Sequence, residues 1–265
     1  MNRRGHRGLF FLCALCVLCG EKFGMSANVF HFQRFSITQD RTAFKVGTDG
    51  ILLGAWADDT AVSHALDIGT GTGLLALMLA QRCPEAKIDA VEIDASAAAQ
   101  AAENVNRSQW SERVQVMNTA VQTFTRRTSQ RYDLIVSNPP FFAAQAGLSA
   151  RGQREGTRQT TMLTHEELIG CVDLLLAENG RFCTILPIAA AGAILKNAAT
   201  HKLHCTRKTA VRSMPHKSPH RMLLQFERVA KPAQIDTLTI ETAQHHVYTD
   251  EFIALTRQFY LSFVD

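Results

Sequence analysis

After its first 24 residues, the sequence lacks the cysteine pairs of disulfide-rich and zinc-binding proteins, and it lacks repeats and flexible linkers. Four of its seven cysteines are scattered without a CxxC pair among them, so they form neither a disulfide framework nor a zinc site. The other three, Cys13, Cys16 and Cys19, share one short stretch near the start. No internal repeat and no Pro/Gly/Ser-rich linker divides the rest. A composition of 46% hydrophobic and 20% charged residues over 265 positions is that of a globular protein, and we expect a single domain after an N-terminal extension.

The apolar run near the start is too short to cross a membrane. Residues 9–19 give eleven apolar positions, whereas a spanning helix needs about 20. Because Arg3, Arg4 and Arg7 precede it, this run looks like a secretion signal. The alternative is that translation starts at Met25 and that residues 1–24 are a wrongly assigned extension. We expect the second case, since the cofactor chemistry indicated downstream belongs in the cytoplasm, and we take 25–265 as the domain.

Short apolar runs alternate with helical patterns from residue 29 onward. This alternation is typical of βαβ units and a parallel sheet. Thr164 and Glu167 form a capping-box pattern at the start of one helix. The sequence predicts strands at 64–68, 87–93, 114–117, 132–137 and 181–186, helices at 74–82, 95–107, 164–177, 189–199 and 250–263 (the last capped by Asp250), a loop at 145–159, and an antiparallel pair of strands at 203–212 and 221–228.

Three alternate glycines, Gly69, Gly71 and Gly73, connect the first of these strands to the first helix. Glycines let a ligand approach the backbone closely, and the helix N-terminus behind them offers N–H groups to an anion. The segment also matches the dinucleotide fingerprint GxGxxA, so the glycines alone leave the cofactor open. Asp67 favours a cofactor with an ammonium group, because a carboxylate faces an ammonium better than a pyrophosphate. Glu92, at the end of the second strand, is placed to accept ribose hydroxyls.

The segment Asn138-Pro139-Pro140-Phe141 ends another strand abruptly. Pro140 forces Pro139 into an extended conformation, so the Asn138 side chain and the Pro139 carbonyl present two fixed acceptors side by side. Phe141 adds a flat apolar face. Two acceptors beside an aromatic plane match a planar group that bears an NH2. The sequence therefore predicts a site for such a group at the carboxyl end of the sheet.

Together the two motifs resemble those of class I S-adenosylmethionine methyltransferases that methylate planar amino groups. The block QDRTAFKVGTDGILLGAW, residues 39–56, narrows the resemblance to the bacterial enzymes that methylate adenine 37 in the anticodon loop of valine tRNA. It implies an α/β, class I methyltransferase (Rossmann-like) fold: a mostly parallel seven-stranded sheet with helices on both faces and an antiparallel edge hairpin. It also implies S-adenosyl-L-methionine as cofactor, tRNA as partner, N6-methylation of adenine as reaction, and neither a metal nor a membrane.

The resemblance also assigns roles to individual residues. The segment Asn138–Phe141 is the expected catalytic site, which holds the target amine and stacks on its base. Ala120 stands where many relatives carry an acid for the cofactor's adenine amine; its backbone N–H can still bind the adenine ring, and the side chain of Asn118 is the candidate to replace the acid. The expected cofactor-binding residues are Lys45, Gly47, Thr48, Asp49, Asp67, Gly69, Gly71, Gly73, Glu92, Ile93 and Ala120.

Basic residues gather in the later part of the chain. Nine Lys/Arg and one acid lie between residues 196 and 231. Such a patch near a base-binding site provides phosphate contacts, although a solvated charged hairpin gives the same pattern. Methylation of an rRNA base or a release-factor glutamine, and an RNA module that binds the cofactor without turnover, stay open as alternatives, whereas an NAD enzyme leaves the Asn-Pro-Pro-Phe motif unexplained. The expected RNA-binding residues are Arg151, Arg154, Arg158, Lys208, Arg212, Lys217 and Arg221.

Overall fold

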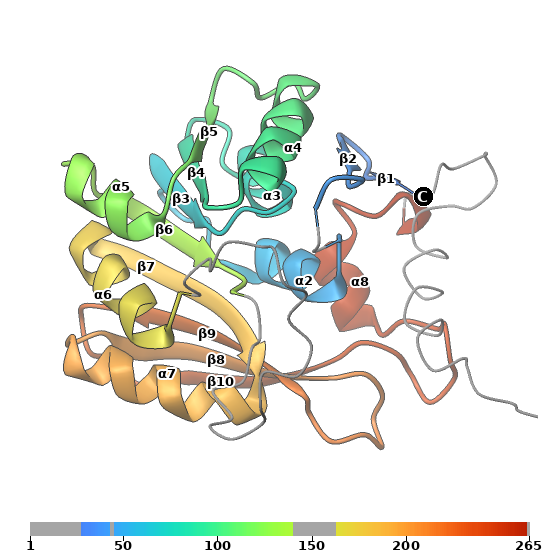
Figure 1. Cartoon of the computed structure of the whole chain (residues 1–265). Helices are drawn as coiled ribbons and strands as arrows, with labels where there is room; N and C mark the ends of the chain where they lie inside the picture. The colour runs from blue at the N-terminus through green and yellow to red at the C-terminus, as the bar shows by residue number, and fades with distance from the viewer. Residues whose placement is uncertain (1–27, 43–44, 140–162, 264–265) are drawn as a thin grey trace, which may run out of the picture.

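The structure, a computed structural model, describes residues 28–42, 45–139 and 163–263. A large sheet runs through the middle of the molecule, with helices on both of its faces (Figure 1). The N-terminal extension predicted at 1–24 and the loop predicted at 145–159 lie outside the described residues.

The elements follow one another in alternation, as the sequence predicts for βαβ units. The strands of the large sheet are β3 His64–Ile68, β4 Lys87–Glu92, β5 Val114–Asn118, β6 Tyr132–Ser137, β7 Leu176–Pro187, β8 His204–Arg212, β9 Arg221–Glu227 and β10 Gln234–Thr239, and a separate hairpin consists of β1 Val29–His31 and β2 Ser36–Thr38. The helices are α2 Thr48–Trp56, α3 Leu74–Arg82, α4 Ala95–Asn106, α5 Val121–Arg127, α6 His165–Leu175, α7 Ile188–Thr200 and α8 Asp250–Thr256, followed by a 3-10 helix at Leu261–Phe263.

The sheet has eight strands in the order β10-β8-β9-β7-β6-β3-β4-β5, rather than the seven predicted. β9 is antiparallel to both neighbours, and every other pair in this sheet is parallel. The predicted antiparallel pair is therefore present as β8 and β9, but it does not form the edge, because β10 pairs with β8 in parallel. Most side chains of β10 are exposed, so its sequence carries no apolar run that marks a strand.

Two hydrophobic cores lie on the two faces of the sheet. Successive residues of the central strands point to opposite faces, as the pleat of a strand requires. In β3, for example, Ala65 belongs to the core that includes residues of α2, α3 and α8, and Leu66 belongs to the core beneath α5, α6 and α7. Figure 1 shows these two helical layers on either side of the sheet. Because both faces are buried at the centre of the sheet, the middle of β6 reads as a continuous apolar run, Leu134-Ile135-Val136.

Local side chains determine where the helices begin. The Thr164 hydroxyl accepts from the Glu167 N–H at 3.1 Å, and the Glu167 carboxylate accepts from the Thr164 N–H at 2.8 Å, which confirms the predicted capping box. The cap of α8 is Thr249 rather than Asp250, because the Thr249 hydroxyl accepts from the Phe252 N–H at 3.2 Å. The prediction of Asp250 as cap was therefore wrong by one residue.

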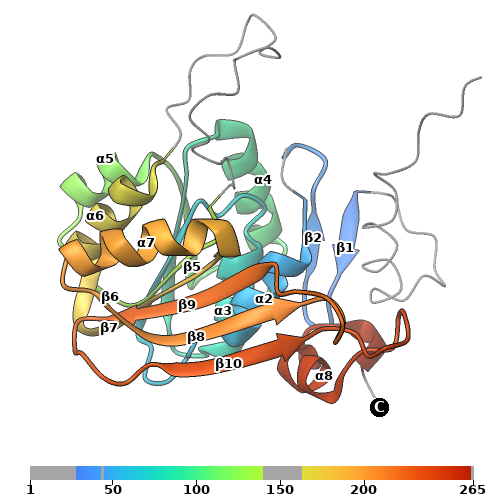
Figure 2. The same ribbon diagram turned by 90° about the horizontal axis from the view of Figure 1, so that it is seen from below.

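The helix predicted at 250–263 ends at Thr256. The chain turns there and buries Phe259 and Tyr260 completely. The N-terminal hairpin packs against this turn: Gln33 Nε2 donates to the carbonyl oxygens of Arg257 at 2.6 Å and Tyr260 at 2.7 Å. Figure 2 shows α8 beside the β1–β2 hairpin. The helix therefore gives way to a turn that buries two aromatic residues, one of which, Tyr260, packs against Phe30 and Phe32 of the hairpin region.

Candidate active site

The predicted site lies where β3, β4 and β6 end. The three strands are neighbours, since Ile68 of β3 pairs with Val91 of β4 and with Ser137 of β6. The Ser137 hydroxyl also donates to the Ile68 carbonyl at 2.9 Å. The loops that follow these strands therefore emerge at the same end of the sheet. We call this end, where the parallel strands finish, the carboxyl edge. Ligands of open parallel sheets bind at this edge.

The three glycines after β3 form a loop that leaves space beside its backbone. Gly69, Gly71 and Gly73 have φ values of +74°, +56° and +84°, which other residues rarely adopt. A Cβ atom at either of the first two has no described atom within 4 Å, whereas a Cβ at Gly73 lies 3.4 Å from the Cβ of Ala101 in α4. The first two glycines thus leave room for a ligand, and the third lets α4 pack against the loop.

Asp67, near the end of β3, is completely buried behind this loop. Its Oδ2 atom accepts from the Thr70 hydroxyl at 2.6 Å and from the Ala76 N–H at 3.2 Å. Its Oδ1 atom is buried without a hydrogen-bond partner among the described residues. Burial raises the pKa of Asp67 to about 7. A cationic ligand group that reached Oδ1 would supply the missing partner and favour the ionised form.

Glu92, the last residue of β4, has its carboxylate oriented by the backbone. One oxygen accepts from the Gly71 N–H and the other from the Asp94 N–H, both at 3.0 Å. Each oxygen keeps a further lone pair for a ligand hydroxyl. Ile93 follows with 47% of its surface exposed, which is apolar area on which a ring can pack.

Ala120 and Asn118 lie beside this strand end. Ala120 is the N-cap of α5 and makes no side-chain cap. The Asn118 NH2 group donates to the carbonyl oxygens of Glu92 at 2.9 Å and Ile93 at 3.1 Å. The amide of Asn118 therefore braces the turn that carries Glu92 and Ile93.

Asn138 and Pro139 follow β6 directly at the carboxyl edge. Pro139 is buried, and the Oδ1 atom of Asn138 is buried without a hydrogen-bond partner among the described residues. The Asn138 amide lies close to α2, since a Cβ atom on Gly50 is 3.8 Å from Asn138 Nδ2. A bound NH2 group requires an acceptor that no protein donor occupies, and Asn138 Oδ1 meets this requirement among the described residues. Pro140 and Phe141 lie outside the described residues.

The residues expected to cover the cofactor occupy the start of α2. Lys45 is exposed, Gly47 is the N-cap, and Thr48 and Asp49 form the first turn. Asp49 Oδ2 accepts from Arg221 Nε at 2.7 Å. The structure thus brings together a residue predicted to bind the cofactor and a residue predicted to bind RNA.

The basic residues of region 196–231 lie at different ends of the strands, because β8 runs toward the carboxyl edge and β9 runs away from it. Arg212 ends β8, Lys217 lies in the turn that follows, and Arg221 starts β9, so these three lie at the carboxyl edge. Lys208 lies in the middle of β8. The predicted residues Arg151, Arg154 and Arg158 lie outside the part of the chain that the structure describes.

Other basic residues of this region make internal contacts, and two of them, Arg228 and Lys231, lie at the opposite edge. The Arg207 guanidinium lies over the Trp56 ring at 4.2 Å from its centroid. Arg228 pairs with Asp173, and Lys231 pairs with Glu227, each at 2.8 Å. The basic count in the sequence therefore overstates the charge available to RNA, because part of it is neutralised within the fold.

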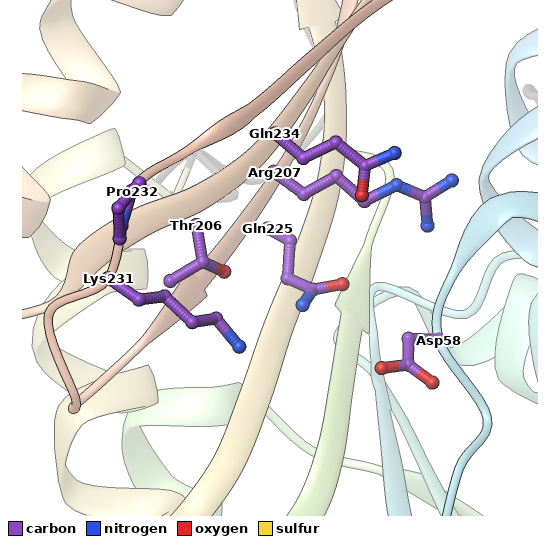
Figure 3. A pocket seen from close by; sticks show the side chains of 7 residues that line it. All are labelled: Asp58, Thr206, Arg207, Gln225, Lys231, Pro232 and Gln234. Atoms are coloured by element: carbon purple, nitrogen blue, oxygen red, sulfur yellow. The ribbon is translucent and has the colours of Figure 1, made fainter.

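A polar cavity of about 290 Å³ lies at this opposite edge (Figure 3). Its carboxylate Asp58 pairs with Arg181 at 2.7 Å, and its ammonium Lys231 pairs with Glu227. The cavity is therefore at the other end of the strands from the predicted site, and its charges are largely satisfied by the protein. Its lining residues are Asp58, Thr206, Arg207, Gln225, Lys231, Pro232 and Gln234.

Two buried polar residues of α4 hold backbone segments that border the predicted site, and the sequence analysis missed both. Asn104 Oδ1 accepts from the Thr38 N–H, and its Nδ2 donates to the carbonyl oxygens of Thr38 and Thr72, all at 2.9 Å. Gln100 Oε1 accepts from two further backbone N–H groups of the same N-terminal segment, at 3.2 and 3.1 Å. Together they connect the segment before α2 to the glycine loop. The signal in the sequence is a pair of amides four residues apart in an alanine-rich helix.

Within residues 28–42, 45–139 and 163–263, no group of three or more His, Cys, Asp or Glu side chains could hold a metal ion. In the same ranges no helix is long and apolar enough to span a bilayer.

Curated relatives match most of the chain. It is 46% identical over 241 residues to the tRNA1(Val) (adenine(37)-N6)-methyltransferase of Trichodesmium erythraeum. These residues make up 90% of this chain and 100% of the relative. It is 44% identical over 242 residues to the protein of the same name from Klebsiella pneumoniae, which covers 91% and 98%. The chain belongs to the tRNA1(Val) (adenine(37)-N6)-methyltransferase family. The resemblance inferred from the sequence is confirmed.

Two further comparisons agree with membership of this methyltransferase family. The family model described as "Methyltransferase small domain" matches residues 44–166. A predicted O-methyltransferase from Agrobacterium tumefaciens has a TM-score of 0.62 at 19% identity and covers 80% of this chain and 96% of its own. A ribosomal protein L11 methylase from Lactobacillus delbrueckii has a TM-score of 0.53 at 16% identity and covers 76% and 100%. The class I, Rossmann-like fold is therefore confirmed, with one strand more than predicted.

Proposed function

We propose that the chain transfers a methyl group from S-adenosylmethionine to N6 of adenine 37 in the anticodon loop of valine tRNA. Family membership gives the reaction. The observation that carries the proposal in this chain is the Oδ1 atom of Asn138, which is buried at the carboxyl edge and has no partner among the described residues. An exocyclic NH2 group is the donor that this acceptor lacks.

The residues around the glycine loop fit S-adenosylmethionine. The unpartnered oxygen of Asp67 suits the ammonium of the methionine part, and the space beside Gly69 and Gly71 admits that part next to the backbone. The oriented oxygens of Glu92 suit two ribose hydroxyls, and Ile93 offers apolar surface to the adenine ring. When bound, the cofactor supplies an activated methyl group.

Asn138 and Pro139 act by positioning the target amine. The side-chain oxygen of one and the carbonyl oxygen of the other accept the two N–H bonds, which directs the nitrogen lone pair at the methyl group. Such orientation can be worth on the order of 7–11 kcal/mol. The methylated amine then loses its proton to water, so no general base is needed. Stacking of the base on Phe141 stays a prediction from the sequence.

The tRNA approaches across the carboxyl edge. Arg212 and Lys217 lie at this edge, and we propose that they contact phosphates of the anticodon arm. Lys208 and the arginines at 151, 154 and 158 stay predictions from the sequence. A base in an anticodon loop is already unpaired, so its movement into the site costs little. The enzyme works where its cofactor and tRNA are found, in the cytoplasm.

Methyl transfer to tRNA tests the reaction. Total tRNA from a strain that lacks the gene is incubated with labelled cofactor, and nucleosides and modified positions are identified. We expect N6-methyladenosine at position 37 of valine tRNA, and a loss of at least roughly 100-fold in kcat for Asn138→Ala with cofactor binding intact. Methylation of rRNA or a release-factor peptide instead, or cofactor binding without product, supports one of the alternatives. Full activity of Asn138→Ala contradicts the mechanism.

A pair of lysines on either side of β8 tests the direction of approach. Lys217 is exposed after this strand at the carboxyl edge, and Lys202 is exposed before it at the opposite edge. We expect Lys217→Gln to reduce the slope of log K against log salt for tRNA binding by about one unit, because one phosphate contact is lost. Lys202→Gln is the matched control and leaves affinity and slope unchanged. Equal effects of the two variants contradict the proposed face.

A further inference from the structure

We propose that Arg221 takes part in the reaction as a positioning residue that acts through Asp49, rather than as a contact for an RNA phosphate. This inference rests on the proposed function, because it concerns the site that holds the target adenine. The two residues are 172 positions apart in the sequence, and their pairing joins the first turn of α2 to the start of β9.

The pair is partly withdrawn from water. Arg221 Nε donates to Asp49 Oδ2 at 2.7 Å, and the two side chains are 27% and 22% exposed. A second N–H group of the guanidinium, on Nη1, donates to the carbonyl of His220 at 3.2 Å. These contacts turn the guanidinium toward α2 and its own strand. A phosphate at this guanidinium competes with the carboxylate that already occupies it.

The strand on which Arg221 lies is well anchored. Arg221 pairs with Pro187 of β7 and with Val211 of β8, so it lies between two strands at the carboxyl edge. The first turn of α2 has weaker local support: Gly47 provides no side-chain cap, and the Ile51 N–H reaches the Gly47 carbonyl at 3.3 Å. The sheet therefore fixes Arg221, and Arg221 in turn holds Asp49 and the first turn of α2.

The held turn borders the catalytic amide. Gly50 follows Asp49, and a Cβ atom on Gly50 is 3.8 Å from Asn138 Nδ2 and 3.0 Å from a methyl group of Leu74. A shift of this turn changes the wall against which the Asn138 amide rests. Because misplacement of a reacting group by about 1 Å can cost on the order of 100-fold in rate, loss of the pair is expected to appear in kcat.

A charge reversal separates positioning from phosphate binding. We expect Arg221→Met and Asp49→Asn each to lower kcat at saturating tRNA and cofactor by about 10–100-fold, with the Kd for tRNA changed less than threefold. The double variant Asp49→Asn/Arg221→Met should be no worse than either single variant. The swapped variant Asp49→Arg/Arg221→Asp should recover at least tenfold in kcat over Asp49→Arg alone, which a purely phosphate-binding Arg221 cannot do.

Other results overturn the inference. Arg221 is a phosphate contact if Arg221→Met weakens tRNA binding and reduces its salt slope as Arg212→Met does. In that case Asp49→Asn leaves tRNA affinity and kcat unchanged. An unchanged kcat in both single variants also overturns it. If Arg221→Met does not fold, Arg221→Lys provides the same comparison of kcat with Kd. Failure of the proposed function is distinguishable, because the unaltered chain then makes no N6-methyladenosine at all.

Discussion

The backbone N–H of Gly71 donates to the carboxylate of Glu92 at 3.0 Å, so the acid that ends β4 is bound to the loop that follows β3. The second carboxylate oxygen accepts from the Asp94 N–H at the same distance. Glu92 therefore accepts from two backbone donors in this arrangement, one on each carboxylate oxygen. Its orientation is set by the protein before any ligand arrives, which reduces the cost of binding.

This arrangement makes glutamine an unusually poor replacement for Glu92. In Glu92→Gln the NH2 group has to face one of two backbone N–H groups, which leaves a donor without an acceptor at a cost of about 1–3 kcal/mol. We expect the cofactor Kd to rise by about 10–100-fold, measured by calorimetry, with a lower unfolding temperature as well. An unchanged Kd contradicts the assignment of Glu92 to the ribose.

Asp67 offers the opposite case, because asparagine can keep its internal contacts. In Asp67→Asn the amide oxygen still accepts from the Thr70 hydroxyl and the Ala76 N–H, and the NH2 group takes the place of the unpartnered oxygen. We expect equal or greater stability at pH 8 together with a cofactor Kd raised by about tenfold or more, since the ammonium loses its acceptor. Thermal unfolding and calorimetry check the two effects separately.

The pKa of Asp67 also predicts a pH dependence. Between its unfolded value of 3.8 and its folded value of about 7, the folded state binds more protons than the unfolded state. Stability therefore falls as pH rises through this window. Cofactor affinity should rise with pH, by up to about tenfold per unit below pH 7, and level off above it. Both trends should disappear in Asp67→Asn, and their persistence there would assign them to another group.

Asn104 tests the connection between α4 and the glycine loop. Asn104→Ala removes three hydrogen bonds and leaves backbone groups of Thr38 and Thr72 unpaired, for which we expect a loss of about 3 kcal/mol in the free energy of unfolding. The KM for the cofactor should rise while kcat changes less. Asn106→Ala, at the exposed end of the same helix, is the control and should stay within about 0.5 kcal/mol of the unaltered protein.

His220 reports on the Asp49–Arg221 pair. Burial and the positive charge of Arg221 lower the pKa of His220, and the charge of Asp49 opposes them. We expect Arg221→Met to raise this pKa and Asp49→Asn to lower it further, as followed by NMR titration of the imidazole. Shifts of the same sign in both variants would show that the pair does not form in solution.

Two glycines outside the site should respond to alanine in opposite ways. Gly192 lies inside α7, and a Cβ atom there has no described atom within 4 Å, so Gly192→Ala should stabilise the protein by about 0.5–1 kcal/mol. A Cβ at Gly180 lies 2.7 Å from the Tyr132 carbonyl oxygen, so Gly180→Ala should destabilise it. Denaturant unfolding of the two variants measures both effects.

Local sequence patterns predicted the central strands and the glycine loop because the decisive interactions lie within them. The apolar run of β3 is buried on both faces. The positive φ of the three glycines in the loop after it is a property of those residues alone. The same reasoning missed α2, α5 and β10. Nearly every residue of α2 is buried, so no polar face reveals its helical period.

In the candidate site, sequence reasoning reaches those residues whose type alone indicates the chemistry, as at Asp67, Glu92 and Asn138, and their roles stay predictions. It was incomplete where a role depends on a distant partner. Gln100 and Asn104 receive their roles from a segment about 60 residues earlier, and Arg221 from Asp49 at a separation of 172. Neither pairing leaves a mark in the neighbouring sequence.

The β1–β2 hairpin is synthesised long before the residues that hold it. Its Gln33 side chain finds its acceptors 224 and 227 positions later, at Arg257 and Tyr260. At about 5–20 residues per second, the ribosome delivers them roughly 10–45 s after the hairpin. During that interval the apolar rings of Phe30 and Phe32 lack their C-terminal cover. We therefore expect nascent chains to engage chaperones until residues 257–260 have been synthesised, and deletion of residues 250–263 to impair solubility more than activity per folded molecule.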